Sequence, residues 1–292
     1  MIAEPRGLLI FFRSGGVSHL PITSGELVSP NQSNASQNAV CSLDRLTHGT
    51  ALPQDTVEAL RSICTLRRYT AGQAIAEAGE EPGFVGCVQH GVLRMQKTLQ
   101  DGRQHIVGLL VEGDMFGRVL GGTLDVAIEA ATDAEVCAFR RAPFETLLAQ
   151  SPELDRLVLV SVLTELDRAR DWMIILGTPR IRERLAGFLL VLCTRFATTD
   201  NLLRARGTAL DVVVPINRTD LAHLLGTRPE SISRAFHALA DTGCITLRKP
   251  DLIGILDLEA LAAEAGEDEL KGRATLKFLL ASVQARASKS SG

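Results

Sequence analysis

The sequence predicts an α+β protein with an N-terminal antiparallel β-roll or jelly roll, a long connecting helix and a C-terminal winged helix-turn-helix. Three observations support this fold class. Between Tyr69 and Leu120, glycines recur and separate short apolar runs, as in strands broken by turns. From Pro152 onward, apolar residues repeat at helical spacing. Two short helical patterns flank a tight turn between Asn217 and Gly243.

Length and composition limit the class of protein. A chain of 292 residues, 46% of them hydrophobic, can bury a sizeable core in about two domains. No apolar run approaches the roughly 20 residues of a membrane-spanning helix, so we expect a cytoplasmic protein with no membrane partner. The six cysteines are scattered without a C-x-x-C pair, which argues against a disulfide framework and against a zinc site.

Shifts in composition divide the chain into five segments. The first is predicted to be disordered, because it becomes rich in Ser, Asn, Gln and Gly and has no period. The segments are 1–40, the β-roll at 41–150, the connecting helix at 151–176, the winged helix-turn-helix at 177–258 and a C-terminal tail at 259–292. Gly177-Thr178-Pro179 is the expected hinge, and Leu258 to about Ala265 closes the last domain.

The β-roll admits two functional interpretations. An Asp-Gly pair ending at Gly102 is a hairpin signal, and more strand is expected from about Ala127 to Phe139. Cupin-type metalloenzymes use a similar barrel, but they need a close His-x-His with a Glu and a later His. Here His90 and His105 stand alone with no carboxylate at ligand spacing, so we predict neither a metal site nor an enzyme. A cupin-like effector-binding or enzymatic barrel that does not bind DNA is the alternative function.

The connecting helix carries an apolar seam with the spacing 3, 4, 3, 4, 3 that is typical of coiled coils. Pro152 occupies the N-terminal turn, where proline is tolerated. A second apolar face is expected to pack on the β-roll, and it consists of Leu157, Val158, Val160 and Leu163. The seam is then predicted to face a second copy of the chain in a homodimer. Its members are Leu159, Val162, Leu166, Ala169, Met173 and Leu176.

The two short helices have the start and stop signals of a helix-turn-helix. Asn217 followed by Asp220 is a capping pattern, and Gly226 suits the left-handed residue that ends the first helix. Pro229 falls in the first turn of the second helix. The second helix has an apolar inner face of Ile232, Ala235, Phe236 and Leu239. Its opposite face can hydrogen-bond base edges and consists of Glu230, Ser233, Arg234 and His237.

Charge favours DNA over the alternative of an ordinary helical hairpin with a merely solvated polar face. Residues 177–250 contain eleven Arg and Lys against six Asp and Glu, a net charge of +5, whereas the whole chain has −3. A basic module in an acidic protein is typical of phosphate binding. Cys244–Leu247 and Leu252–Leu256 predict a two-stranded wing. Further candidate DNA contacts are Arg218 and Arg228. Arg248 and Lys249, in the turn between the two strands, are candidate phosphate contacts, but a merely solvated turn is about equally compatible with the sequence.

The segment Glu230-Ser231-Ile232-Ser233-Arg234 resembles the E-x-x-S-R recognition-helix pattern of the Crp/Fnr family of bacterial transcription regulators, in the form used by the Fnr branch. The likeness runs from about Cys41 to about Ala265 and includes the segments Asp114-Met115-Phe116-Gly117 and Pro143-Phe144-Glu145. One position departs from the pattern. Arg228 replaces a threonine that is usual there, so the cap of the second helix is expected to be weak.

This resemblance implies several properties. The β-roll would be a double-stranded β-helix like that of cyclic-nucleotide-binding domains, and the helix at 151–176 would be the dimerisation helix. The homodimer would bind palindromic double-stranded DNA with TTGAT-like half-sites and would work with RNA polymerase. The regulated genes would serve oxygen-limited or nitrogen-oxide metabolism.

The resemblance also bears on cyclic AMP. Family members that bind it hold the ribose with a Gly-Glu pair and the phosphate with an arginine beside Ser or Thr. In the corresponding segment, 117–127, Arg118 replaces the glutamate and no arginine follows. Asp125 and Glu129 would repel an anion there. We therefore expect no binding of cyclic AMP.

An iron–sulfur cluster is not expected either. The Fnr branch holds its cluster on three cysteines near the N-terminus and one in the β-roll. Cys137 matches the ligand in the roll and Cys41 the last N-terminal ligand, but Pro30 and Ser33 stand where the other two belong. No cofactor is therefore predicted. Regulation by abundance, by another ligand such as haem, or by oxidation of Cys41 or Cys137 is left open.

Overall fold

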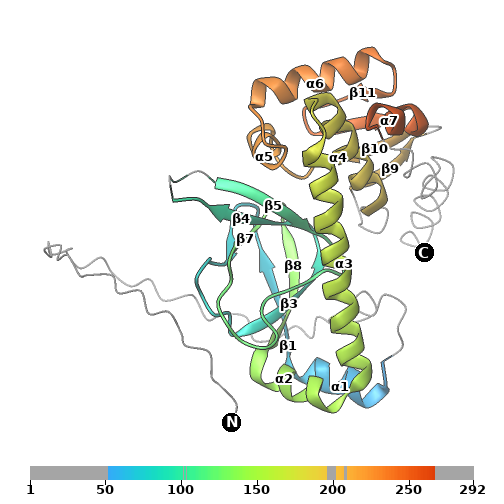
Figure 1. Ribbon diagram of the computed structural model, residues 1–292. Helices are drawn as coiled ribbons and strands as arrows, with labels where there is room; N and C mark the ends of the chain where they lie inside the picture. The colour runs from blue at the N-terminus through green and yellow to red at the C-terminus, as the bar shows by residue number, and fades with distance from the viewer. Residues whose placement is uncertain (1–51, 101, 103, 196–201, 207–208, 267–292) are drawn as a thin grey trace, which may run out of the picture. The chain divides into compact units, whose positions relative to one another are not determined.

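The computed structural model describes residues 52–100, 102, 104–195, 202–206 and 209–266 (Figure 1). The predictions for residues 1–40, for Cys41 and for the tail beyond residue 266 lie outside the described residues. Within the described ranges, a β-roll, a long helix and a C-terminal α/β domain follow one another along the chain. None of the helices in these ranges is long and apolar enough to cross a membrane.

The β-roll contains two four-stranded antiparallel sheets, as the glycine-separated apolar runs predict. The first has the strand order β1-β8-β3-β6 and the second the order β2-β7-β4-β5. The strands are β1 (Cys64–Tyr69), β2 (Ala74–Ala76), β3 (Phe84–His90), β4 (Leu93–Thr98), β5 (Gln104–Leu110), β6 (Met115–Phe116), β7 (Ala127–Ala130) and β8 (Ala134–Arg140). The hairpin predicted around Gly102 is the connection between β4 and β5.

The core of the roll draws apolar side chains from both sheets. It includes Phe84, Leu93, Leu110, Phe116, Ile128 and Val136. The rings of Phe84 and Phe116 meet edge to face with their centroids 6.2 Å apart. A Cβ atom on Gly86 would lie only 2.2 Å from the Cζ atom of Phe116, so the ring can pack here because this position is glycine.

Three helices cover the outer face of the first sheet. They are α1 (Gln54–Ile63), α2 (Arg141–Gln150) and the first turns of α3 (Pro152–Gly177). Leu60, Phe144 and Leu154, one from each helix, are buried against Val85 and Phe139 of the sheet. The hydroxyl of Ser151 caps α3 by accepting a hydrogen bond of 3.3 Å from the backbone N–H of Leu154.

The prediction for the inner face of α3 was only partly right. Leu157 is buried and Val158 is partly buried, but Val160 and Leu163 are exposed. The buried face of α3 continues instead with Trp172 and Ile175. Val160 and Leu163 therefore lie beside the exposed seam rather than on the opposite side of the helix. An ion pair of 2.5 Å from Arg168 Nη1 to Asp114 Oδ1 also fixes this orientation.

The predicted seam of α3 points away from the core of its own chain. All six members are exposed, and the five larger ones retain 40–65% of their accessible surface. Ile174 is likewise exposed, so the apolar stripe is wider than the seam alone. A stripe of this length on one helix is typical of a surface that another helix covers.

In the part of the chain that the structure describes, the C-terminal domain combines four helices with one antiparallel sheet. The sheet has the order β11-β12-β10-β9. The elements are α4 (Ile181–Arg195), β9 (Leu203–Arg206), β10 (Ala209–Val213), α5 (Arg218–Leu224), α6 (Pro229–Asp241), β11 (Ile245–Leu247), β12 (Leu252–Ile255) and α7 (Leu258–Glu264). Helix α7 lies in the segment that the sequence analysis expected to close the domain, although residues from 259 onward were counted with the tail. Its Leu261 and Ala262 belong to the core of this domain.

One apolar cluster continues from the edge of the β-roll into the C-terminal domain. Ile106 and Leu109 of β5 belong to the same cluster as Trp172 of α3 and Phe188 of α4. The rings of Trp172 and Phe188 lie 6.0 Å apart. Helix α5 also contacts β5 directly. The helix-turn-helix therefore packs through α5 on a strand of the second sheet of the roll.

Candidate nucleic-acid interface

The first helix of the helix-turn-helix, α5, has the ends that the sequence predicts. The Asn217 side chain accepts a hydrogen bond of 2.8 Å from the backbone N–H of Asp220. Its amide group also donates to Asp220 Oδ2 at 2.9 Å, so the two side chains form a closed cap. After α5, Gly226 has a φ of 63°, the left-handed conformation that turns the chain towards α6.

The second helix, α6, buries its predicted inner face. Ile232, Ala235, Phe236 and Leu239 are all in the core. Arg228 precedes the helix, and within the described residues its side chain makes no capping hydrogen bond. The weak cap expected at this position is therefore confirmed.

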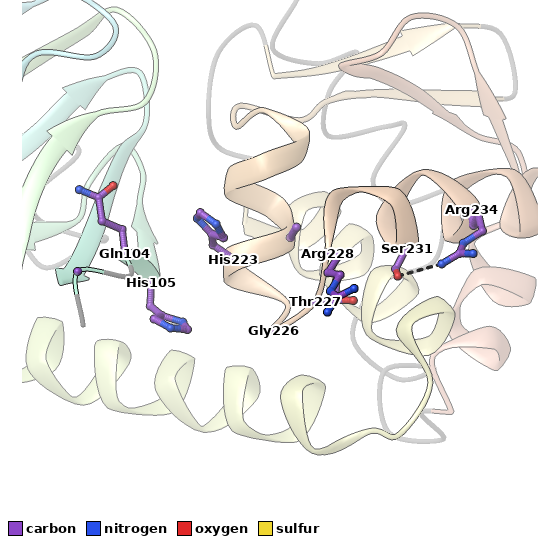
Figure 2. Close-up of a pocket in the computed structure, with 10 residues that line it drawn as sticks. Gln104, His105, His223, Gly226, Thr227, Arg228, Ser231 and Arg234 are labelled. Carbon is purple, nitrogen blue, oxygen red and sulfur yellow. Dashed lines mark hydrogen bonds between the residues drawn. The ribbon is translucent and has the colours of Figure 1, made fainter. Parts of the chain in front are cut away.

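The polar face of α6 is exposed along its whole length. Glu230, Ser233, Arg234 and His237 all face solvent. Ser233 donates to the carbonyl of Pro229 at 3.2 Å, and Arg234 donates to the hydroxyl of Ser231 at 3.3 Å (Figure 2). These contacts leave most donors of the Arg234 guanidinium available for an external partner.

Arg218, a predicted DNA contact, makes two contacts within its own domain. Its guanidinium lies 3.5 Å from the centroid of the Phe236 ring and donates to the carbonyl of Pro250 at 2.6 Å. Burial lowers its pKa, and the charge of Asp251 opposes that shift. The half-buried side chain therefore joins α5, α6 and the wing.

The wing residues separate into two kinds. Arg248 Nε donates to Asp211 Oδ1 at 2.6 Å, and Asp211 is buried. Arg248 is thus engaged across the sheet, and its role as a phosphate contact stays a prediction. Lys249 is exposed at the tip of the wing and is still a candidate phosphate contact.

Arg184 belongs to none of the motifs identified in the sequence, yet it helps to hold the helix-turn-helix in place. Its Nε donates to the carbonyl of Thr178 at 2.8 Å, and its Nη1 donates to the carbonyl of Leu225 at 2.9 Å. It therefore ties the hinge to the last turn of α5. The sequence analysis missed it because both acceptors are backbone groups, which no side-chain pattern reveals.

An open pocket of about 940 Å³ lies between the β4–β5 hairpin and the helix-turn-helix (Figure 2). Gln104 and His105 line it on the side of the hairpin, and His223, Arg228 and Arg234 line it on the other side. Among the described residues that line it there is no carboxylate. The pocket is continuous with the polar face of α6 and suits an anionic partner.

The histidines of the roll have different surroundings. The Nδ1 atom of His90 lies 3.1 Å from Oε1 of Glu112, a carboxylate 22 residues away and so outside the ligand spacing that the sequence analysis considered. The turn after β5 brings Glu112 to the end of β3, a contact that sequence spacing does not reveal. His105 lines the open pocket. Among the described residues, no group of three or more His, Cys, Asp and Glu side chains is arranged to hold a metal ion.

Two further predicted positions can be placed in the roll. Arg118 forms an exposed ion pair with Asp125 at 3.2 Å, within the segment that corresponds to the cyclic-AMP site. Cys137 is fully buried in β8 and takes part in a disulfide, which the scattered cysteine pattern did not predict. Burial raises the pKa of the Cys64 thiol to about 11 and that of Cys193 to about 12, so both stay protonated at neutral pH.

The two domains match known families separately. Residues 66–151 match the family described as cyclic nucleotide-binding domain, and residues 183–264 match the Crp-like helix-turn-helix domain. The transcriptional activator protein FnrL of Cereibacter sphaeroides is 35% identical over 209 residues, which cover 72% of this chain and 84% of that protein. The nitrogen fixation regulation protein FixK of Bradyrhizobium diazoefficiens is 36% identical over 60% of this chain and 73% of its own.

The solved structures show the same arrangement. FixK2 from Bradyrhizobium japonicum superimposes with a TM-score of 0.61 and 28% identity, covering 69% of this chain and 96% of that one. The β-roll, the long helix and the helix-turn-helix thus occur together in a solved regulator, which confirms the predicted fold class. The chain therefore belongs to the Crp/Fnr family of DNA-binding transcription regulators.

Proposed function

We propose that this protein binds palindromic double-stranded DNA as a homodimer and reads TTGAT-like half-sites with α6. The observation that carries the proposal is the exposed polar face of Glu230, Ser233 and Arg234, beside a pocket with no carboxylate in its described lining. The forked guanidinium of Arg234 suits O6 and N7 of a guanine, and the Glu230 carboxylate suits the amino group of a cytosine. Ser233 is an adaptable third contact.

The seam of α3 supports the homodimer. Its six apolar side chains are exposed in the single chain, and their 3–4 spacing allows two copies of α3 to pack as a coiled coil. Two-fold symmetry would place two copies of α6 roughly 34 Å apart, the repeat of the DNA helix, and facing a palindrome.

The names of the relatives suggest what is regulated. FnrL is a transcriptional activator and FixK a regulator of nitrogen fixation. We extend this to control, with RNA polymerase as partner, of genes for oxygen-limited or nitrogen-oxide metabolism. Binding alone, without catalysis, would accomplish this function.

A titration of the full chain with labelled duplexes tests the proposal. Fluorescence anisotropy should show binding to a TTGAT palindrome that is at least 10³-fold tighter than binding to a scrambled duplex, with steep weakening as salt is raised. Equal affinity for the two duplexes would contradict sequence-specific binding, and no binding at low salt would contradict a DNA partner altogether.

We further propose that the protein works without an iron–sulfur cluster. Cys137 is the one family-matched ligand among the described residues, and it is already engaged in a disulfide. Anaerobic purification should yield colourless protein. A brown preparation with about four irons per subunit would refute this part of the proposal, and haem absorption would identify a different cofactor.

A further inference from the structure

Arg94 of β4 connects the β-roll to the helix-turn-helix. Its Nη2 atom lies 2.5 Å from Oε1 of Glu129 on the neighbouring strand β7, and its Nη1 atom bonds to Oδ2 of Asp220 in α5. The side chains of all three residues are only 17–22% exposed, so the contact is largely shielded from solvent. Gln96 completes the group by donating to Glu129 Oε2 at 3.0 Å.

The partner of Arg94 in α5 is part of the cap of that helix. Oδ2 of Asp220, which receives Arg94, also accepts the hydrogen bond from the amide of Asn217. A charge-assisted pair of this kind is directional, because the guanidinium has fixed donor directions. Arg94 therefore fixes the start of α5, and the roll supplies the group that does so.

The orientation of α5 determines that of α6. The two helices are joined by the short turn at Gly226, and both bury side chains in one core. Arg184 ties the end of α5 to the hinge. In this arrangement the reading residues Ser233 and Arg234 remain exposed, so the contact holds α6 in an orientation that DNA can reach.

We propose that Arg94 is a positioning residue for DNA binding, which sets the direction of α6 relative to α3 and thereby the separation of the two recognition helices in the dimer. This inference rests on the dimeric, palindrome-binding function proposed above. Without the contact, the hinge at Thr178 allows the C-terminal domain more orientations, and only a fraction of the dimers presents both helices at the separation of the half-sites. Binding to a single half-site requires only one recognition helix, so its affinity does not depend on the separation of the two helices.

The experiment compares Arg94→Met with Arg68→Met in the full chain. Arg68 is a matched control, because it also forms a cross-strand pair with a glutamate, Glu135, at 2.8 Å in the same roll. We expect Arg94→Met to weaken binding to the palindrome about tenfold, within the usual range of coupling between sites. Its affinity for a single half-site should be unchanged. Adding two base pairs between the half-sites should weaken the binding of this variant less than it weakens the binding of the wild type. Arg68→Met should match the wild type in all three measurements.

A double-mutant cycle with Asp220→Asn separates positioning from general damage to the roll. Asparagine keeps an oxygen that can accept from Asn217 but lacks the charge that Arg94 binds. If Arg94 acts through Asp220, then Arg94→Met has no further effect on palindrome affinity in the Asp220→Asn background. Fully additive losses, or equal losses on the half-site and the palindrome, would overturn the inference.

The wild-type measurements keep the two proposals distinguishable. If the wild type prefers the palindrome over the half-site and Arg94→Met does not change this preference, only the positioning role of Arg94 is refuted. If the wild type shows no preference for the palindrome, the proposed function fails and the positioning role fails with it. Circular dichroism melting of each variant verifies that all chains are folded at the temperature of the titration.

Discussion

The guanidinium of Arg218 in α5 lies 3.5 Å from the centre of the Phe236 ring in α6, and this contact holds the two helices of the helix-turn-helix together. Arg218 looks like a DNA contact in the sequence because it stands at the start of the first helix of a basic motif. The structure shows it half-buried, with a second contact to the carbonyl of Pro250 in the wing. A cation over an aromatic face with a backbone acceptor stabilises the fold of the domain.

Removing the charge of Arg218 and removing that of Lys249 should therefore have opposite effects on stability and on the salt dependence of DNA binding. Arg218→Met should lower the free energy of unfolding by about 1–2 kcal/mol and leave the salt dependence of DNA binding unchanged. Lys249→Met should leave the stability unchanged and reduce the salt slope by about 1. Urea unfolding and anisotropy at several salt concentrations measure the two effects. The reverse pattern would show that the functional assignment of these two residues is wrong.

Arg234 should contribute to sequence preference as well as affinity. Arg234→Ala is expected to cost roughly 1–3 kcal/mol on the palindrome and to relax the preference at a single base pair of each half-site. Titration of duplexes substituted at each position identifies that base pair. An equal loss on the palindrome and on scrambled DNA would make Arg234 a phosphate contact only.

The seam of α3 should determine the oligomeric state. Leu166→Asp places a charge in the middle of the proposed interface, where it would be buried against its symmetry mate, so the variant should be monomeric and should lose palindrome binding. Leu120→Asp is the control, because Leu120 is also apolar and is 89% exposed in the roll but lies outside α3. Sedimentation velocity should show a dimer for the control. An unchanged dimer for Leu166→Asp would exclude this seam as the interface.

The roll should not bind cyclic AMP. Arg118, at the position where cyclic-AMP-binding relatives carry a glutamate, is paired with Asp125, which leaves a carboxylate close to where a cyclic phosphate would lie. Calorimetric titration of the full chain with cyclic AMP should give no heat beyond dilution. Binding with micromolar affinity would show that other groups in the roll hold the phosphate.

Local patterns predicted the helix-turn-helix well because its determinants are close in sequence. Asn217 and Asp220 form a cap within one turn, and Gly226 adopts the positive φ that its position requires. The buried positions of α6 follow from helical spacing alone. In each case, the physical cause lies within a few residues of its effect.

The contacts that the sequence did not predict join partners that are distant in the sequence. Arg248 is paired with Asp211, 37 residues away, and His90 with Glu112, 22 residues away. Arg94 and Asp220 are separated by 126 residues. A charged residue in a plausible motif position looks available until the fold supplies its counter-charge. For that reason, sequence reasoning found the face of α6 but not the residues that support it.

The exposed seam of α3 has a consequence for the dose response of the protein. Six apolar side chains that are uncovered in the single chain favour pairing, and pairing follows mass action. While most chains are single, doubling their concentration raises the concentration of pairs about fourfold. For the proposed homodimer, promoter occupancy would then rise more steeply than the amount of protein synthesised. Promoter occupancy would thus respond steeply to the rate at which the chain is synthesised, even without a bound effector.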